Sequence, residues 1–311
     1  MRTWQVGDVR ITQVIELGGQ PTSGMFFFPA ADAEFVKRYA WLRPHFANEE
    51  GRLFASVHAF VIESQGRRII VDTCVGNDKP RRVRAWDRLR GPFLQDLARA
   101  GHPPESIDTV VCTHLHVDHV GWNTRLADGR WVPTFANARY LFGRIEWAHW
   151  SAQVAAHDGQ GDPPGEADVL ADSVRPIVDA GLADLVEMDH RITDEVWLEP
   201  TPGHTPGHVS VHIVSQGREA VITGDLMHHP IQCSEPDLAN NFDSDREAAR
   251  LTRRAFLARY SDRPVLVLGT HFAPPTGGWV VRAGEAWQFS VGEAGQFSVG
   301  PQPGASGGQV G

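Results

Sequence analysis

The chain is poor in cysteine and has no long apolar run. Its three cysteines, Cys74, Cys112 and Cys233, are odd in number and widely spaced. This pattern suits a reducing compartment better than a disulfide framework, and we expect all three to be packing residues. No run of 18 apolar residues occurs, and the first eight residues lack the apolar stretch of a signal peptide. We therefore expect a cytoplasmic protein with no membrane partner.

Basic residues are also in deficit. The 29 Lys and Arg residues face 38 Asp and Glu residues, which gives a net charge of −9. The densest basic stretch is 79–84, and the acidic total argues against a nucleic-acid partner. With 311 residues and 41% apolar content, the chain can bury a full core but is short for two domains. A single domain over residues 1–283 is predicted.

Side chains that bind metals are plentiful and follow apolar runs. The run 107–112 reads as a buried strand, and four such side chains follow it directly. Three more follow the apolar runs 196–198, 220–224 and 265–270. The seven residues are His114, His116, Asp118, His119, His204, Asp225 and His271. Since ligands in open α/β sheets gather at strand ends, we expect these seven to converge at one sheet edge.

The residue types predict the kind of cation. Neutral imidazoles and carboxylates suit zinc, and also iron, manganese or cobalt, and no cysteine is required. Seven donors can hold two divalent cations, of which Zn²⁺ is favoured. A carboxylate is the natural bridge, because each of its oxygens can face one metal. Two close cations can share and activate a hydroxide for attack on an electrophile.

The His-x-His-x-Asp-His loop at 114–119, followed by His204, Asp225 and His271, resembles the signature of the metallo-β-lactamase fold superfamily. The resemblance covers about residues 8–282 and implies an α/β fold, the four-layer αββα sandwich. It assigns His114, His116 and His204 to one metal. It assigns Asp118, His119 and His271 to the second, with Asp225 as the bridge. Asp118 has a second implied task, which is to orient the bridging hydroxide.

Neighbouring residues narrow the reaction. Asp225 disfavours antibiotic hydrolysis, because β-lactamases of this fold place a cysteine there or lack a bridging carboxylate. His116 argues against flavodiiron chemistry, which uses a glutamate at that position. Glyoxalase II thioesterases share all seven ligands but recognise glutathione through basic residues near the C-terminus. After His271 the only basic residue is Arg282, so the thioesterase hypothesis is weaker than that of an ester hydrolase.

Segment 223–232 resembles the matching stretch of methyl parathion hydrolase-like and lactonase-like enzymes. In those relatives a His or Tyr three residues past the bridging Asp faces the substrate oxygen, and His228 occupies that place. A packed His228 is the alternative. His229 is expected to be structural, and His208 to support the site from behind its ligands.

Aromatic residues offer an apolar wall for the substrate. The run 25–29 and Trp122 are the candidates. The resemblance implies that an N-terminal extension, around 20–54, covers the active site or forms a homodimer contact. A core or dimer-contact role is the more common one for such aromatics, and a substrate wall is the alternative.

Local patterns predict the remaining organisation. Residues 9–15 alternate like a strand, and 56–62 with 68–72 read as a hairpin. Helices are predicted over 92–100, over 144–156 and from a capping box at Ser244 to about Arg259. The last should place Leu251 and Phe256 on its packed face. The Gly/Pro-rich stretch 158–165 is expected to be a surface loop, and 284–311 a mobile, low-complexity tail.

These observations predict a dinuclear metal-dependent hydrolase. A metal-bridging hydroxide would open a small-molecule ester, above all a lactone, with aryl ester or phosphotriester activity on the side. The predicted site comprises the seven ligands together with Asp118 and His228 as catalytic residues. A glyoxalase II-like thioesterase and a non-catalytic metal-binding scaffold are the alternatives.

Overall fold

Several strands are buried on both faces, and the two faces belong to different cores. In β3 (Leu53–Ser64), Phe60 packs into one apolar cluster and Val61 into another. β12 (Arg218–Ile222) shares the first of these clusters but turns its other face toward a third. Because successive strand residues point to opposite sides, such strands must form inner layers. Three clusters therefore separate four layers.

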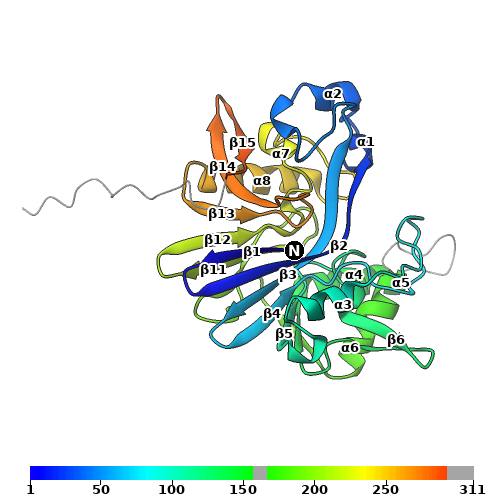
Figure 1. The fold of residues 1–311 in the computed structure, drawn as a ribbon. Helices are drawn as coiled ribbons and strands as arrows, with labels where there is room; N and C mark the ends of the chain where they lie inside the picture. Colours follow the sequence, from blue (N-terminus) through cyan, green and yellow to red (C-terminus); the bar gives the residue numbers. More distant parts are fainter. Residues whose placement is uncertain (157–166, 293–311) are drawn as a thin grey trace, which may run out of the picture.

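The computed structural model describes residues 1–156 and 167–292, and these form two main sheets with helices outside both. Figure 1 shows the helices α3–α6 gathered in one half of the molecule and α7 and α8 in the other. This is the predicted αββα sandwich.

The first sheet has seven strands in the spatial order β1-β2-β3-β4-β5-β8-β9. Besides β3 they are β1 (Arg2–Val6), β2 (Val9–Thr22), β4 (Arg67–Val71), β5 (Thr109–Val111), β8 (Arg139–Gly143) and β9 (Ala183–Val186). A separate hairpin joins β6 (Thr124–Ala127) to β7 (Arg130–Pro133). The predicted strand at 9–15 and the predicted hairpin at 56–72 are confirmed by β2, β3 and β4.

The second sheet has six strands in sequence order. Besides β12 they are β10 (Val196–Pro200), β11 (Val209–Ser215), β13 (Val265–Leu268), β14 (Gly277–Ala283) and β15 (Ala286–Ser290). Pairing is parallel only between β12 and β13 in this sheet, whereas β4-β5, β5-β8 and β8-β9 are parallel in the first. The carboxyl ends of these parallel strands carry the loops of the site.

Helices cover the outer faces. The α-helices are α1 (Gly24–Phe27), α2 (Ala33–Lys37), α3 (Phe93–Arg99), α4 (Arg144–Ala156), α5 (Ala167–Val169), α6 (Arg175–Asp179), α7 (Ile231–Ser234) and α8 (Arg246–Tyr260). Short turns of other helix types are η1 (Ala40–Leu42), η2 (Pro104–Ser106), η3 (Gly121–Asn123), η4 (Leu170–Val174) and η5 (Gly224–Leu226). α3, α4 and α6 pack on the first sheet through Phe93, Trp150 and Ile177. α8 packs on the second through Phe256 and Leu257.

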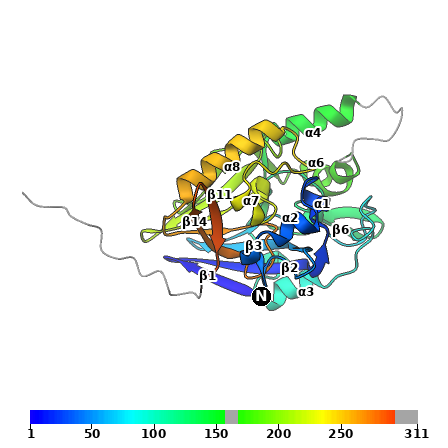
Figure 2. The ribbon, with the colours of Figure 1, turned by 90° about the horizontal axis from the view of Figure 1, so that it is seen from above.

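The N-terminal segment crosses from the first sheet to the second. β2 runs on into α1 and α2, which lie beside α7 in both views (Figures 1 and 2). The backbone N–H of Asn241 donates to the carbonyl of Phe27 at 2.8 Å, and the hydroxyl of Tyr39 bonds the carboxylate of Glu235. The expected extension at 20–54 therefore packs against the C-terminal half of the chain.

The start and packed face of α8 differ from the prediction. Asp245, not Ser244, caps the helix, because its side chain accepts the backbone N–H groups of Glu247 and Ala248. Leu251 is 53% exposed, whereas Arg253 and Phe256 face the core. The apolar spacing was misleading here because one position of the buried face is an arginine.

The boundary predicted at Gly284 is too early. Residues Ala286–Ser290 form β15, which pairs antiparallel with β14. Trp287 and Phe289 are buried in the core beneath α7 and α8. Two aromatics at alternate positions signal a half-buried strand. The sequence of residues 285–292 is nearly repeated at 293–300, and this repeated octet concealed the strand. Residues 293–311 of the expected tail, and the expected loop 158–165, lie outside the described residues. Among the described residues, no helix is long and apolar enough to cross a membrane.

Candidate metal centre

Asp72 fixes the start of the loop that carries four of the seven predicted ligands. It follows β4 and has a positive φ of 56°. Its carboxylate accepts the backbone N–H of Thr113 at 2.8 Å and the hydroxyl of the same residue at 2.9 Å. It also bonds Nδ1 of His119 at 2.9 Å. This bond turns Nε2 of His119 toward the centre of the site, as in other carboxylate–histidine pairs at metals.

Cys74 stands two positions after Asp72, where the resemblance to the metallo-β-lactamase fold superfamily implies a glycine. Cys74 takes the left-handed backbone conformation with φ of 54°, which glycine adopts without cost. Its carbonyl accepts the backbone N–H of Gly121 at 2.7 Å. A Cβ at Gly121 would lie 1.9 Å from the carbonyl oxygen of Val75. The absence of a side chain at Gly121 therefore allows the metal loop to pack closely against this turn.

The other three predicted ligands follow strands of the second sheet. His204 lies in the loop between β10 and β11, Asp225 comes after β12 and His271 after β13. The structure brings all seven side chains together, as the strand-end argument predicted. Their role as metal ligands stays a prediction.

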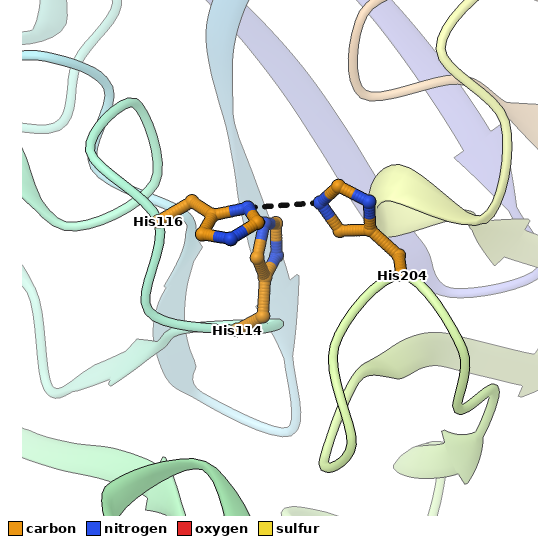
Figure 3. A group of neighbouring side chains, drawn as sticks. All are labelled: His114, His116 and His204. Carbon is orange, nitrogen blue, oxygen red and sulfur yellow. Dashed lines mark hydrogen bonds between the residues drawn. The ribbon is translucent and has the colours of Figure 1, made fainter. Parts of the chain in front are cut away.

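Three imidazoles form the first cluster. Nδ1 of His116 lies 3.1 Å from Nε2 of His114 and 2.9 Å from Nε2 of His204 (Figure 3). Nitrogens bound tetrahedrally to zinc at about 2.0–2.1 Å would lie roughly 3.3 Å apart, so the spacing fits one cation. Burial and the neighbouring imidazoles hold the pKa of all three histidines well below the ordinary value. They are therefore neutral near pH 7, which is the form that binds metal.

The second cluster combines a carboxylate with two imidazoles. The carboxylate of Asp118 lies 3.6 Å from Nε2 of His119 and 3.4 Å from Nε2 of His271. Burial opposes a charge on His271, but Asp225 and Asp118 outweigh it and raise its pKa to about 9. The same carboxylates with Asp72 raise the pKa of His119, again against its burial.

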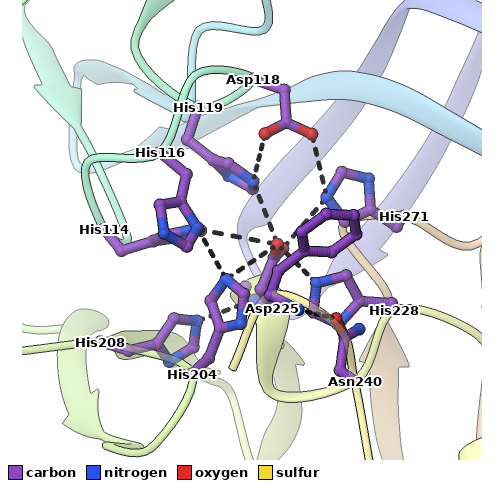
Figure 4. Close-up of polar contacts among 12 residues, drawn as sticks. His114, His116, Asp118, His119, His204, His208, Asp225, His228, Asn240 and His271 are labelled. Carbon is purple, nitrogen blue, oxygen red and sulfur yellow. Dashed lines mark hydrogen bonds and ion pairs between the residues drawn. The ribbon is translucent and has the colours of Figure 1, made fainter. Parts of the chain in front are cut away.

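Asp225 lies between the two clusters (Figure 4). One oxygen, Oδ2, is 3.3 Å from Nε2 of His119 and 3.4 Å from Nε2 of His204. The other, Oδ1, is 3.2 Å from Nε2 of His271. Burial favours the protonated acid, but the surrounding imidazoles outweigh it and hold the pKa of Asp225 well below its usual range. A buried anion ringed by imidazoles is placed to bridge two cations.

The buried polar atoms of this centre fit a pair of divalent cations. Nε2 of His119 and Oδ1 of Asp225 are buried, and neither makes a hydrogen bond in the described structure. Such atoms are costly unless a partner compensates them. The donor set of imidazole nitrogens and carboxylate oxygens is the one that zinc and related cations use.

His208 contacts the backbone of Asp225 and holds it in place, in agreement with its expected supporting role. Its Nδ1 lies 3.0 Å from the carbonyl of Thr201, and its Nε2 accepts the backbone N–H of Asp225 at 2.7 Å. Burial lowers the pKa of His208 to about 4, so the ring stays neutral and keeps this acceptor.

His228 lies against the bridging carboxylate. Its Nε2 is 3.0 Å from Oδ2 of Asp225, its Nδ1 is buried without a hydrogen bond, and its ring stacks on His271 at 5.5 Å. With His204 and Asp225 it also forms a group whose donor atoms lie within 4.8 Å of one another. His229 instead bonds the carbonyl of Phe46 at 2.8 Å and is structural.

Two acidic residues at the site were not foreseen. The buried carboxylate of Glu146 accepts the backbone N–H groups of Gly207 at 2.8 Å and Leu115 at 3.3 Å, and so ties two ligand loops together. Asp243 bonds Nδ1 of His204 at 3.1 Å. Neither has a diagnostic spacing, because each reaches the site from a distant part of the chain.

A cavity of about 760 Å³ opens onto the clusters. Its apolar lining includes residues of the N-terminal segment, the loop after β4 and the loop before α8: Leu17, Phe26, Phe27, Val83, Trp86 and Phe242. Phe26 and Phe27 thus form part of the wall, which was one of the two roles considered for the aromatic run. Phe28 is fully buried in the core instead, and Met25 is 52% exposed.

Of its two possible roles, Trp122 takes the core role. Its ring stacks on Phe93 with centroids 5.8 Å apart, and its indole N–H donates to Glu16 at 2.6 Å. Glu16 also accepts the backbone N–H of Val75 at 2.8 Å. Trp122 therefore belongs to the core that supports the metal loop.

A family model described as the metallo-beta-lactamase superfamily matches residues 53–271. The chain belongs to this superfamily. Its match to a probable metallo-hydrolase of Mycobacterium tuberculosis is 26% identical over 194 residues, covering 55% of this chain and 57% of the relative. An N-acyl homoserine lactonase of Bacillus thuringiensis is 22% identical over 174 residues, covering 56% of this chain and 59% of that protein. The chain thus spans just over half the length of these curated relatives.

Two solved structures share the fold along nearly the whole chain. A hydrolase named AbOPH superposes with a TM-score of 0.75 at 26% identity, covering 92% of this chain and 95% of its own. The dizinc quorum-quenching lactonase AidC, solved in complex with a product, superposes with a TM-score of 0.72 at 18% identity. That match covers 93% of this chain and 96% of the lactonase.

Proposed function

We propose that the chain is a dinuclear metal-dependent hydrolase that opens an ester, specifically a lactone. The observation that carries the proposal is a pair of three-donor clusters that share Asp225 at the inner end of a largely apolar cavity. Such a lining suits an uncharged substrate with an apolar chain. Relatives named as N-acyl homoserine lactonases support the choice of a lactone.

The residues that would hold the two cations fall into the clusters described above. His114, His116 and His204 would hold one, and Asp118, His119 and His271 the other, with Asp225 shared. When bound, two zinc ions would supply an activated hydroxide near neutral pH and stabilise negative charge on the substrate oxygens.

Asp118 and His228 are the side chains proposed to act on the substrate and the attacking water. Both line the cavity. The side chain of Asp118 is 11% exposed, and its carboxylate can accept a proton from water and orient it for attack. Nε2 of His228 lies beside Asp225, where its N–H can donate to the carbonyl oxygen of an ester.

The test compares substrates on one zinc-loaded preparation. kcat/KM would be measured for an N-acyl homoserine lactone, an aryl phosphotriester and a glutathione thioester, each before and after chelation. The proposal expects a chelator-sensitive preference for the lactone. Preference for the thioester would favour the glyoxalase II-like alternative, and a metal-loaded protein inert toward all three would favour the scaffold. A homodimer and a cytoplasmic location remain predictions.

A further inference from the structure

An arginine is buried beneath the site and belongs to none of the groups assigned above. Arg253 lies on α8 and is 1% exposed. Its Nε donates to the carbonyl of Leu226 at 3.0 Å, and its Nη1 donates to the carbonyl of Pro236 at 2.8 Å. Burying a guanidinium is costly unless it is paired and hydrogen-bonded, so these contacts are what keep it there.

The guanidinium also approaches a carboxylate that holds a predicted ligand. Nη2 of Arg253 lies 3.7 Å from Oδ2 of Asp243, and both side chains are 1% exposed. Oδ1 of Asp243 lies 3.1 Å from Nδ1 of His204. A carboxylate can only accept, so Nδ1 carries the proton and the lone pair of Nε2 faces the first cluster. The order Arg253–Asp243–His204 thus sets the tautomer of a metal-binding ring.

The hydrogen bonds of the Arg253 guanidinium to backbone carbonyls also link it to the segment of Asp225, the predicted bridging residue. Leu226 directly follows Asp225, so the bond from Nε of Arg253 anchors the backbone that carries the bridging carboxylate. α8 is itself tied to the loop of His204, because Thr252 donates to the carbonyl of Pro202 at 2.7 Å. A Cβ at Gly203 would lie 2.2 Å from the backbone nitrogen of Ala249, which shows how closely loop and helix pack.

A third branch reaches His228. The carbonyl of Leu238 accepts both Nη1 of Arg253 at 3.4 Å and Nε2 of Gln232 at 3.3 Å. Oε1 of Gln232 accepts the backbone N–H of His228 at 2.8 Å. One guanidinium therefore connects the segments of three site residues.

We propose that Arg253 is a positioning residue of the metal centre, which acts through Asp243 to hold the His204 ring for the first cluster. The inference rests on the proposed metal binding and adds that the affinity of the first cluster depends on a side chain that touches no cation. Partners of ligating histidines typically change metal affinity by about 10–100-fold when removed.

Two substitutions separate this role from simple packing. In Asp243→Asn, the amide oxygen should occupy the Oδ2 position, where the backbone N–H of Asn240 donates at 3.3 Å and Arg253 approaches. The NH₂ group then faces Nδ1 of His204 and donates a hydrogen bond to it. The ring proton must move to Nε2, so Nε2 no longer has a free lone pair with which to bind a cation. Arg253→Lys keeps the charge but cannot bond carbonyls and carboxylate together as a planar fork does.

Arg254→Lys is the matched control. Arg254 is the next residue on the same helix, is 41% exposed, and pairs with Asp237 at the surface. Zinc affinity would be measured by competition with a chromophoric chelator, and the visible absorption of the Co²⁺-loaded proteins would report the ligands of each site. Circular dichroism and thermal unfolding of the metal-free proteins would report folding.

We expect both test variants to lose about 10–100-fold in affinity for one of two zinc equivalents, with a changed Co²⁺ spectrum for that equivalent and no change in Arg254→Lys. If Arg253→Lys fails to fold, Asp243→Asn decides the test, because it conserves volume and the bond from Asn240. Two equivalents bound with wild-type affinity and spectrum in Asp243→Asn would overturn the inference alone. A wild-type chain that binds no zinc would overturn the proposed function as well.

Discussion

A single carboxylate collects five imidazoles around itself at the centre of this site. Oδ2 of Asp225 lies 3.0 Å from His228 and 3.8 Å from His114, with His119 and His204 between these limits, and Oδ1 lies 3.2 Å from His271. Of the five rings, His228 is the one that the family resemblance does not assign to a metal, although its donor atom lies as near as theirs. Substrate contact and metal binding are therefore distinct roles that a single substitution can separate.

His228→Phe is expected to lower kcat/KM for the lactone by about 10²-fold, because it removes a hydrogen-bond donor at the substrate oxygen. Zinc content should stay at the wild-type value, measured by elemental analysis of the same samples. His45→Phe is a suitable control, since His45 is exposed. A loss of one zinc equivalent in His228→Phe would show that the residue is a ligand.

The seven predicted ligands could be located from the sequence because short spacing and strand ends are local signals. Asp243, Glu146 and Arg253 could not, because each acts across a contact between elements far apart in the chain. The role of Trp122 could not be decided from the sequence for a related reason. An aromatic side chain beside a metal loop can face either the cavity or the core. Trp122 faces the core, where its indole N–H donates to Glu16, and this distant partner cannot be identified from the sequence.

At the scale of elements, the strands were the most predictable part. Alternation and turn residues mark β2, β3 and β4, and helix α4 has the bounds that were predicted for it. α8 shows the limit of periodicity, because a buried arginine breaks the apolar stripe. β15 shows another limit, since the first copy of the repeated octet contains a strand that completes the second sheet.

The buried position of Phe289 on β15 and the exposed position of Leu251 on α8 should have different effects on the free energy of unfolding. Phe289→Ala is expected to lower the free energy of unfolding by about 3–5 kcal/mol, because Phe289 is 2% exposed and packs against Phe46 and Phe272. Leu251→Ala should change it by no more than about 0.5 kcal/mol, because that side chain is mostly exposed. Urea unfolding of both variants provides the comparison. Equal effects would mean that β15 does not contribute to the core.

At the scale of the whole molecule, the two halves meet at the site. The first sheet supplies four predicted ligands and the second supplies three, so cation binding would join the halves. Metal affinity and folding stability should therefore be linked. Because the imidazoles are in different protonation states, both quantities should also depend on pH.

The pKa of His271 fixes the direction of that dependence. Asp225 and Asp118 overcome the effect of burial and raise this pKa to about 9, above the value of about 6.5 in an unfolded chain. The stability that this proton gives the metal-free protein is fully present below pH 6.5 and is lost as pH rises through about 9.

Zinc binding near pH 7.5 should therefore release at least one proton, because the ligand form of His271 is neutral. Release from this residue should decline as pH rises through about 9. Calorimetric titration in two buffers of different ionisation enthalpy measures the number of protons released. No release near pH 7.5 would contradict a role for His271 as a ligand.

If two cations at the shared carboxylate carry out ester hydrolysis, activity should depend on zinc stoichiometry. Lactone opening would be monitored through the acid that it releases, as zinc is added stepwise to the metal-free protein and to His114→Ala. We expect wild-type activity to reach its plateau at two equivalents. We expect at least about a 10³-fold lower rate for His114→Ala, equal to about 4 kcal/mol of lost transition-state stabilisation. Full activity without zinc, or undiminished activity in His114→Ala, would show that the two cations are not required for hydrolysis.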